Sequence, residues 1–225
     1  MDWQAIWLSA RLAALTTAIL LVIAVPLGAW LAFRPRRWWR SCVEAVVALP
    51  LVLPPSVLGF YLLVAMGPRS PFGRAWEGVT GHRLPFSFTG LLIASVLFSL
   101  PFAVQPVTAA FRAIDPRLLE ASRTLGESGA RTLTRVAVPL AVPGIVAAAV
   151  LSFAHTVGEF GVVLMIGGNL PGVTRTVSIS VYDSVQALDH AAAHRTSAVL
   201  LVFSFVVLAA TYTLQRRFVP IGVAP

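Results

Sequence analysis

Long apolar runs separated by shorter polar segments set the pattern of this chain. Runs of about twenty apolar residues indicate membrane-spanning helices, because a helix rises about 1.5 Å per residue and the hydrocarbon of a bilayer is about 30 Å thick. The sequence therefore predicts an all-α integral membrane protein, formed as a single domain over residues 1–225. Five spans are expected, at residues 12–33, 43–66, 88–111, 138–165 and 196–214.

Prolines interrupt the second of these spans. Residues 50–60 read PLVLPPSVLGF, and each proline removes a backbone donor and favours a kink. Membrane helices tolerate such breaks where neighbouring helices or a cavity satisfy the freed backbone groups. Broken helices often border transport pathways, although a simple packing kink explains the prolines equally well.

The polar segment at residues 112–137 carries clear helix signals. Asp115 followed by Pro116 is typical of a helix N-terminus, since an acceptor side chain precedes a residue whose φ is already helical. Gly126 is a typical C-terminal stop. Between them, apolar and small residues recur at helical spacing, namely Leu118, Leu119, Ser122 and Leu125.

A second short helix is expected from Ser128 to about Val136, before Pro139 and Pro143 break it. The segment 112–137 would then form two short amphipathic helices joined at a glycine and held between membrane spans. That arrangement is either a docking element or an ordinary amphipathic hairpin between spans, and the spacing alone does not separate the two.

Residues 169–195 are expected to lie on the opposite side of the membrane. Val177, Val181 and Val185 have helical spacing, which predicts a short helix at the outer surface or, alternatively, a sixth, partial span. Asp183, Asp189, His190 and His194 resemble a metal cluster on paper. The two histidines lack a third ligand and a catalytic glutamate between them, so no metal site is expected.

Composition and charge narrow the function. The chain is 57% hydrophobic and 12% charged, and its net charge of +8 comes from arginine, with no lysine present. A Walker A loop needs its lysine, so any ATP must be hydrolysed by another polypeptide. The arginines flank the apolar runs, which indicates membrane topology and not nucleic-acid binding. Eleven of the seventeen arginines fall on the side of residues 112–137, which places that segment and the C-terminus in the cytoplasm and the N-terminus outside.

Polar side chains at membrane depth are the candidates for a substrate pathway. Ser56, Gln105, Ser152 and Thr156 either line such a pathway or hydrogen-bond between helices. Glu159 is costly in lipid, by roughly 3 kcal/mol. We expect it to accept hydrogen bonds from backbone amides or to pair with an arginine or His155, and the alternative is repulsion of anions at a gate.

A family resemblance rests on the segment that begins at Glu120. It reads E-A-S, three residues, G, nine residues and V-x-V-P. It resembles the cytoplasmic "EAA" loop of bacterial ABC importer permeases, whose matching positions are occupied here by Glu120, Ala121, Gly126, Val136 and Pro139. Ser122 departs from that pattern, as do Val136 and Val138 in place of isoleucine and leucine. The segments LPLVLPPSVLG, GEFG and GNLPG resemble the molybdate and sulfate permease group.

The resemblance implies an ABC importer permease fold, with cytoplasmic coupling helices that press into grooves of two ATPase subunits. It assigns ATPase coupling to Asp115, Leu118, Leu119, Glu120, Ala121, Ser122, Leu125 and Gly126. It also implies ATP and magnesium on the ATPase, no cofactor in this chain, a second copy of the chain, an oxyanion-binding protein outside, and a bacterial inner membrane.

The resemblance favours molybdate as the substrate, with sulfate or tungstate as alternatives. The chain itself is then not an enzyme. A membrane-embedded metal-dependent enzyme built on His155, Glu159, His190 and His194 is the alternative from another class, but the sequence shows no nucleophile–base set for it. A passive channel would have no use for the docking element.

Overall fold

The computed structural model describes residues 1–34 and 37–218. The predicted domain 1–225 also includes Pro35, Arg36 and residues 219–225, which lie outside the described residues. All the regular elements of the described part are helical. In order these are α1 (Trp3–Phe33), α2 (Trp38–Val52), α3 (Pro55–Met66), α4 (Pro71–Thr80), α5 (Phe88–Arg112), α6 (Pro116–Thr124), α7 (Gly129–Thr132), the π-helical turn η1 (Leu133–Ala137), α8 (Val138–Gly158), α9 (Gly161–Gly167), α10 (Val177–Gln186) and α11 (His190–Phe218).

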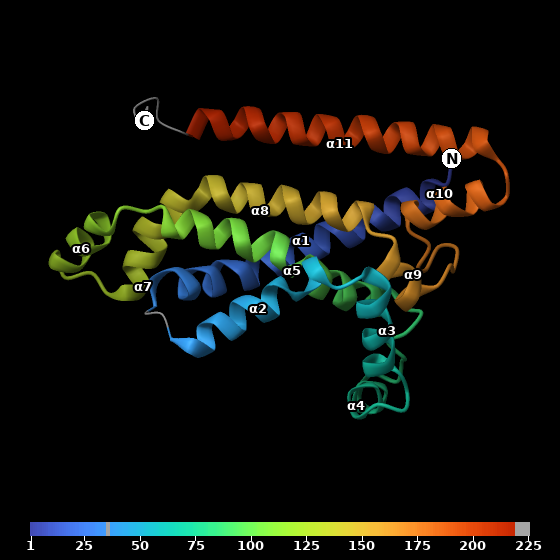
Figure 1. Cartoon of the computed structure of the whole chain (residues 1–225), viewed down its shortest axis with the longest axis horizontal. Coiled ribbons are helices and arrows are strands. Elements are labelled where there is room, and N and C mark those ends of the chain that lie inside the picture. The colour runs from blue at the N-terminus through green and yellow to red at the C-terminus, as the bar shows by residue number, and fades with distance from the viewer. Residues whose placement is uncertain (35–36, 219–225) are drawn as a thin grey trace.

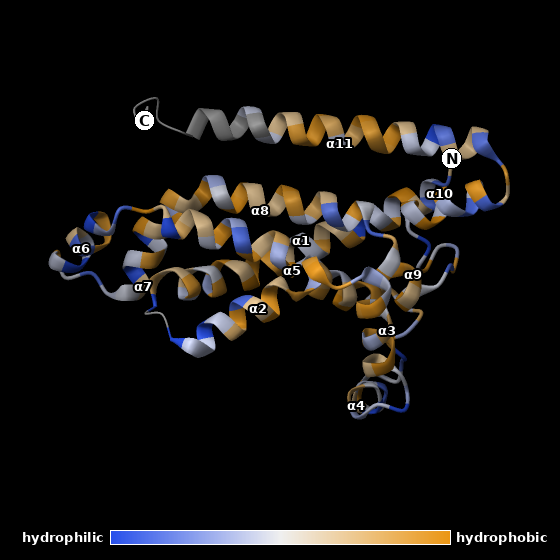
Figure 2. Ribbon diagram, in the orientation of Figure 1, coloured by the Kyte–Doolittle hydropathy of each residue, from blue (hydrophilic) through white to orange (hydrophobic). Residues whose placement is uncertain are grey.

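Helices α1, α5 and α8 pack side by side and form the centre of the molecule (Figure 1). Their facing positions include many small residues, which let helix backbones approach closely in a membrane. At Gly28, for example, an added Cβ would lie only 2.8 Å from Val107 Cγ1. Larger buried side chains such as Leu20 and Phe111 fill the spaces between the helices. Orange and pale segments predominate along the ribbons of these helices, which shows that most of their residues are apolar (Figure 2).

Four helices of the described part are long and apolar enough to cross a membrane, and α2 with α3 makes a fifth span if the bent pair is counted as one. The five-span prediction is confirmed to that extent. Its boundaries differ, since α1 begins at Trp3 and not near Leu12, and α11 begins at His190 and not at Thr196.

The break in the second span falls where the prolines predicted it. Helix α2 ends at Val52, and α3 starts at Pro55 in a direction 113° away. Helix α3 then packs against α9, and an added Cβ at Gly59 would lie 2.8 Å from Met165 Cβ. Two interrupted helices therefore support each other at one end of the bundle (Figure 1).

The prediction that Pro139 and Pro143 break the helix after Val136 was wrong. Residues 129–158 form one long helical stretch in which α7, η1 and α8 follow without a gap. In η1 the Val138 amide bonds to the Leu133 carbonyl, five residues back. This wider turn adjusts the hydrogen-bond register just before Pro139, whose missing N–H would otherwise interrupt it.

Two further predictions need correction. The glycines and prolines of residues 67–87 predict a loop between the second and third spans, but this segment contains α4, which starts at a Ser70 cap and ends at Gly81 with φ +71°. The fourth span was expected to reach residue 165, but α8 ends at Gly158, and the short helix α9 follows after a break. The helix expected around Val177–Val185 is present as α10.

Candidate functional site

Helix α6 has the predicted boundaries. Asp115 Oδ1 accepts a hydrogen bond from the Arg117 amide at 2.9 Å, and Pro116 begins the helix. At the other end, Gly126 has φ +83°. Its amide bonds to the Arg123 carbonyl at 3.0 Å, and the Glu127 amide bonds to the Ser122 carbonyl at 3.2 Å. This pair of bonds is a Schellman motif, which needs a left-handed residue where Gly126 stands.

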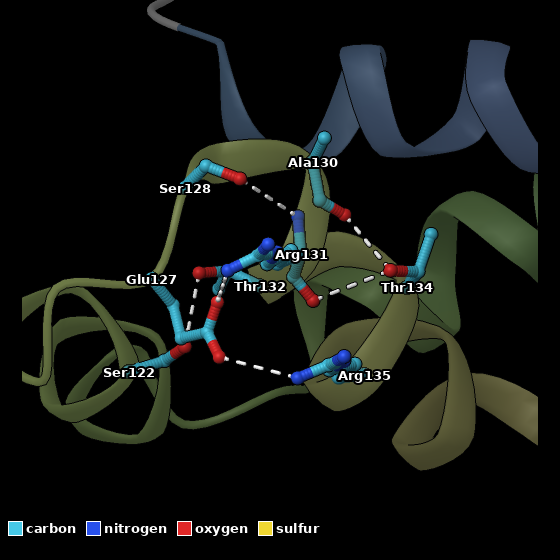
Figure 3. Close-up of polar contacts among 8 residues, drawn as sticks. All are labelled: Ser122, Glu127, Ser128, Ala130, Arg131, Thr132, Thr134 and Arg135. Carbon is cyan, nitrogen blue, oxygen red and sulfur yellow. Dashed lines mark hydrogen bonds and ion pairs between the residues drawn. The ribbon is translucent and has the colours of Figure 1, made fainter.

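Of the polar contacts drawn in Figure 3, the one between Ser122 and Thr132 joins α6 to α7, and the others lie within the segment that follows α6. Ser122 Oγ lies 2.9 Å from Thr132 Oγ1, and both residues are buried. Glu127 lies between Arg131 and Arg135, at 3.6 Å and 3.4 Å. We call the unit of residues 115–135 the elbow. Its two arms are fixed by side chains and are not joined by a slack loop.

Sequence reasoning did not single out Thr132 and Glu127. The Glu127–Arg131 spacing of four residues is typical of helical ion pairs and is visible in the sequence, although Glu127 lies just before α7. The Ser122–Thr132 bond crosses between two helices, so the spacing of neither helix predicts it.

The candidate coupling residues divide between two faces of α6. Leu119 packs against the main apolar cluster of the bundle, and Ser122 is buried beside it. Leu118, Ala121 and Leu125 form a stripe on the adjacent side of the helix, since they lie three and four residues apart. All three are exposed, Leu125 to 83%. Glu120 is also exposed. One face thus anchors the elbow, and the other presents apolar side chains that the described chain leaves uncovered.

The candidate pathway residues do not form one site. Thr156 Oγ1 donates to the Ser152 carbonyl at 2.8 Å and lies 3.1 Å from Ser99 Oγ. Both residues are buried between helices. Ser56 is exposed in the first turn of α3. Gln105 is exposed on α5, where it lines a separate cavity shared with α2.

Glu159 lies in the break between α8 and α9. Its Oε1 accepts a hydrogen bond from the Val162 amide at 2.7 Å, so a backbone amide satisfies the buried carboxylate, which is one of the expected arrangements. His155, one of the alternative partners, makes its contacts elsewhere in the described structure. Nδ1 of His155 lies 3.0 Å from Ser99 Oγ, and its ring stacks on Phe102 with centroids 3.9 Å apart.

Near the α9–α10 end, Asn169 and Arg175 hold the GNLPG segment against α10. Arg175 donates to Asn169 Oδ1 at 2.6 Å and lies 3.5 Å from Asp183, to which Asn169 also donates. Asp183 is therefore engaged in an ion pair. Over residues 1–34 and 37–218, no group of three histidine, cysteine or acidic side chains could hold a metal ion.

This combination of a bundle of membrane-length helices, a broken second span and a rigid polar elbow defines a class of membrane transport component. The family model for "Binding-protein-dependent transport system inner membrane component" matches residues 24–220, and the chain belongs to that family. It is accordingly a multi-pass permease component and not the ATP-hydrolysing subunit.

Individual relatives indicate more closely which members of this family the chain resembles. The molybdenum transport system permease protein ModB of Azotobacter vinelandii is 54% identical over 217 residues, which cover 96% of this chain and 95% of that protein. ModB of Escherichia coli K12 is 36% identical over 82% of this chain and 80% of its own length. The sulfate transport system permease protein CysT of the same organism is 31% identical over 85% of this chain and 69% of its own length.

Solved structures show the same fold. A chain of the MetNI methionine ABC transporter in an inward-facing conformation matches with a TM-score of 0.74 and 18% identity, over 97% of this chain and 96% of that chain. A chain of a bacterial alginate ABC transporter matches with a TM-score of 0.78 and 17% identity, over 98% of this chain and 80% of that chain. The ABC importer permease fold predicted from the sequence is confirmed.

Proposed function

We propose that this chain is the permease subunit of a bacterial ABC importer for molybdate. The observation that carries the proposal is the 54% identity to ModB over nearly the whole of both chains. The lower identity to CysT, 31%, makes sulfate the second candidate, and tungstate is a chemically similar dianion that the same pathway would admit.

In the proposed complex, two copies of the chain form the pathway and two ATPase subunits bind ATP and magnesium. A binding protein outside the membrane delivers the oxyanion. The elbow faces the cytoplasm, the N-terminus lies outside and the C-terminus lies inside. The excess of arginines on the elbow side supports this orientation.

The elbow is the proposed contact with the ATPase. Leu118, Ala121 and Leu125 enter a groove of the ATPase subunit, while Leu119 and Ser122 keep the elbow seated on the bundle. Closure of the ATPase subunits on ATP then moves the elbow as a unit, because its own contacts leave it little internal freedom. A rigid link of this kind transmits movement to the long helices on either side of it.

The test is reconstitution of the chain with its ATPase subunits and binding protein in proteoliposomes. Molybdate loaded on the binding protein should stimulate vanadate-sensitive ATP hydrolysis and should accumulate inside the vesicles. Excess sulfate should compete weakly. Preferred transport of sulfate would move the assignment to the second candidate, and absence of any ATP-dependent oxyanion transport would refute the proposal.

A further inference from the structure

A cavity of about 390 Å³ lies between α2 and α5, in the half of the bundle that leads to the elbow. Its walls are mostly aliphatic. Its polar lining comes from one residue of α2 and three of α5, and the full set is Leu31, Glu44, Val47, Ala48, Val104, Gln105, Thr108, Ala109 and Arg112.

The three polar residues of α5 lie on one face of that helix. Gln105, Thr108 and Arg112 are spaced by three and then four residues, so they form a stripe about 10 Å long at about 1.5 Å per residue. Thr108 Oγ1 already donates to the Val104 carbonyl at 2.7 Å. Within the described part of the chain the Gln105 amide has no hydrogen-bond partner. The donors available to the cavity are therefore Gln105 and Arg112.

Charge at the mouth of the cavity is unbalanced. Oε1 of Glu44 lies 2.6 Å from a guanidinium nitrogen of Arg112 and 3.5 Å from Arg40, so one carboxylate is shared by two cations. Arg40 is buried and is also held by the Arg34 carbonyl at 2.7 Å. Arg112 is half-exposed and borders the cavity. The mouth carries a net positive charge, and Arg112 is the cation that can turn toward a ligand.

We propose that this cavity is an exit-side anion site in which Arg112 is exchanged between Glu44 and the transported oxyanion. The inference rests on the proposed function. A tetrahedral dianion carries only acceptor oxygens, which match the guanidinium fork of Arg112 and the amide of Gln105. Glu44 competes with the dianion for Arg112. The carboxylate therefore limits how tightly the site holds its ligand and favours release.

The competition separates this proposal from a purely structural ion pair. If Glu44 and Arg112 only tie α2 to α5, replacing either residue has the same effect. If they compete as proposed, Glu44→Gln strengthens anion binding and Arg112→Gln removes it. Exposed ion pairs of this kind contribute little, so the gain for Glu44→Gln should be roughly two- to fivefold in affinity.

The experiment measures binding of radiolabelled molybdate by equilibrium dialysis. It uses the nucleotide-free complex of permease and ATPase subunits in lipid nanodiscs, without the binding protein. Glu44→Gln should bind molybdate more tightly than the unaltered complex, Arg112→Gln should lose this binding, and Arg112→Lys should retain part of it. The matched control is the exposed pair of Glu77 and Arg83, 3.1 Å apart at α4, where Glu77→Gln and Arg83→Gln should change nothing.

Changes in the same direction for Glu44→Gln and Arg112→Gln would overturn the inference. If Arg112→Gln fails to assemble with the ATPase, the molybdate affinities of Glu44→Gln and Arg112→Lys still show whether the two residues act in opposite directions. Failure of the proposed function is separate. If the proposed function is wrong, the unaltered complex with its binding protein will not transport oxyanions. If that complex transports normally but Glu44→Gln does not bind molybdate more tightly, only the exit site is refuted.

Discussion

Replacing Gly126 by alanine tests whether the shape of the elbow transmits force. The residue has φ +83°, and no atom lies within 4 Å of the position that a Cβ would take. The cost is therefore backbone strain without a clash, about 1–2 kcal/mol for an L-residue in the left-handed region. Two Schellman bonds oppose that strain, each with a net contribution of about 1 kcal/mol. The strain is thus comparable to the free energy that the two Schellman bonds contribute to the native elbow.

Since about 1.4 kcal/mol is a factor of ten in an equilibrium constant, Gly126→Ala should shift the equilibrium away from the native elbow by about five- to thirtyfold. We expect fewer molybdate ions transported per ATP hydrolysed in proteoliposomes. Gly126→Asn should lose less, because asparagine tolerates this conformation.

The matched control for this experiment is Gly81→Ala. Gly81 ends α4 with φ +71° and equally open surroundings, so alanine there imposes the same strain away from the elbow. The two alanine variants should lose similar thermal stability, and only Gly126→Ala should lose coupling. Equal transport ratios in Gly126→Ala and Gly81→Ala would refute the reasoning.

Three other changes test separate parts of the structure. Ser122→Ala should lower the stability by about 1 kcal/mol in a thermal unfolding assay, because it leaves Thr132 without its hydrogen-bond partner. Adding Thr132→Val should restore most of the lost stability. No recovery in the double variant would argue against the hydrogen bond. Leu125→Asp should weaken co-purification with the ATPase at least tenfold. Val79→Asp, at the similarly exposed surface of α4, should leave co-purification unchanged. Equal losses of co-purification in the two variants would exclude a specific contact at Leu125. Glu159→Gln should keep transport close to normal, because its amide oxygen still accepts the hydrogen bond from the Val162 amide. Glu159→Ala should destabilise the protein by about 1–3 kcal/mol. An assembled but inactive Glu159→Gln variant would show that the charge itself has a role in transport.

Local signals in the sequence predicted the elbow because helix ends are governed by neighbouring residues. The Asp115 cap, Pro116 and the Gly126 stop all act within one turn of the helix, and the structure confirms all three. The same kind of signal, Ser70 followed by Pro71, marks the start of α4, although the glycines and prolines of the surrounding segment favour a loop. A cap followed by proline was the better indicator.

The errors in α8 have a different origin. The spacing of His155 and Glu159 predicts a contact only if the helix continues through both, and it ends at Gly158. Pro139 was read as a stop, yet a single wider turn accommodates it. Both outcomes depend on how neighbouring helices pack, which local periodicity does not encode. The Glu44–Arg112 pair likewise joins residues 68 positions apart, beyond any local pattern.

The position of Arg112 connects the two proposals physically. It is the last residue of α5, and Asp115, the cap of α6, follows three positions later. Between them Ile114 is buried in the main apolar cluster, so the joint between the two helices is short and anchored. In the proposed complex, a displacement of the elbow by the ATPase would therefore reach the end of α5 directly, and it would change the distance between Arg112 on α5 and Glu44 on α2. The proposed exit site would then alternate between carboxylate and oxyanion in step with the ATPase, without a signal carried through the rest of the bundle.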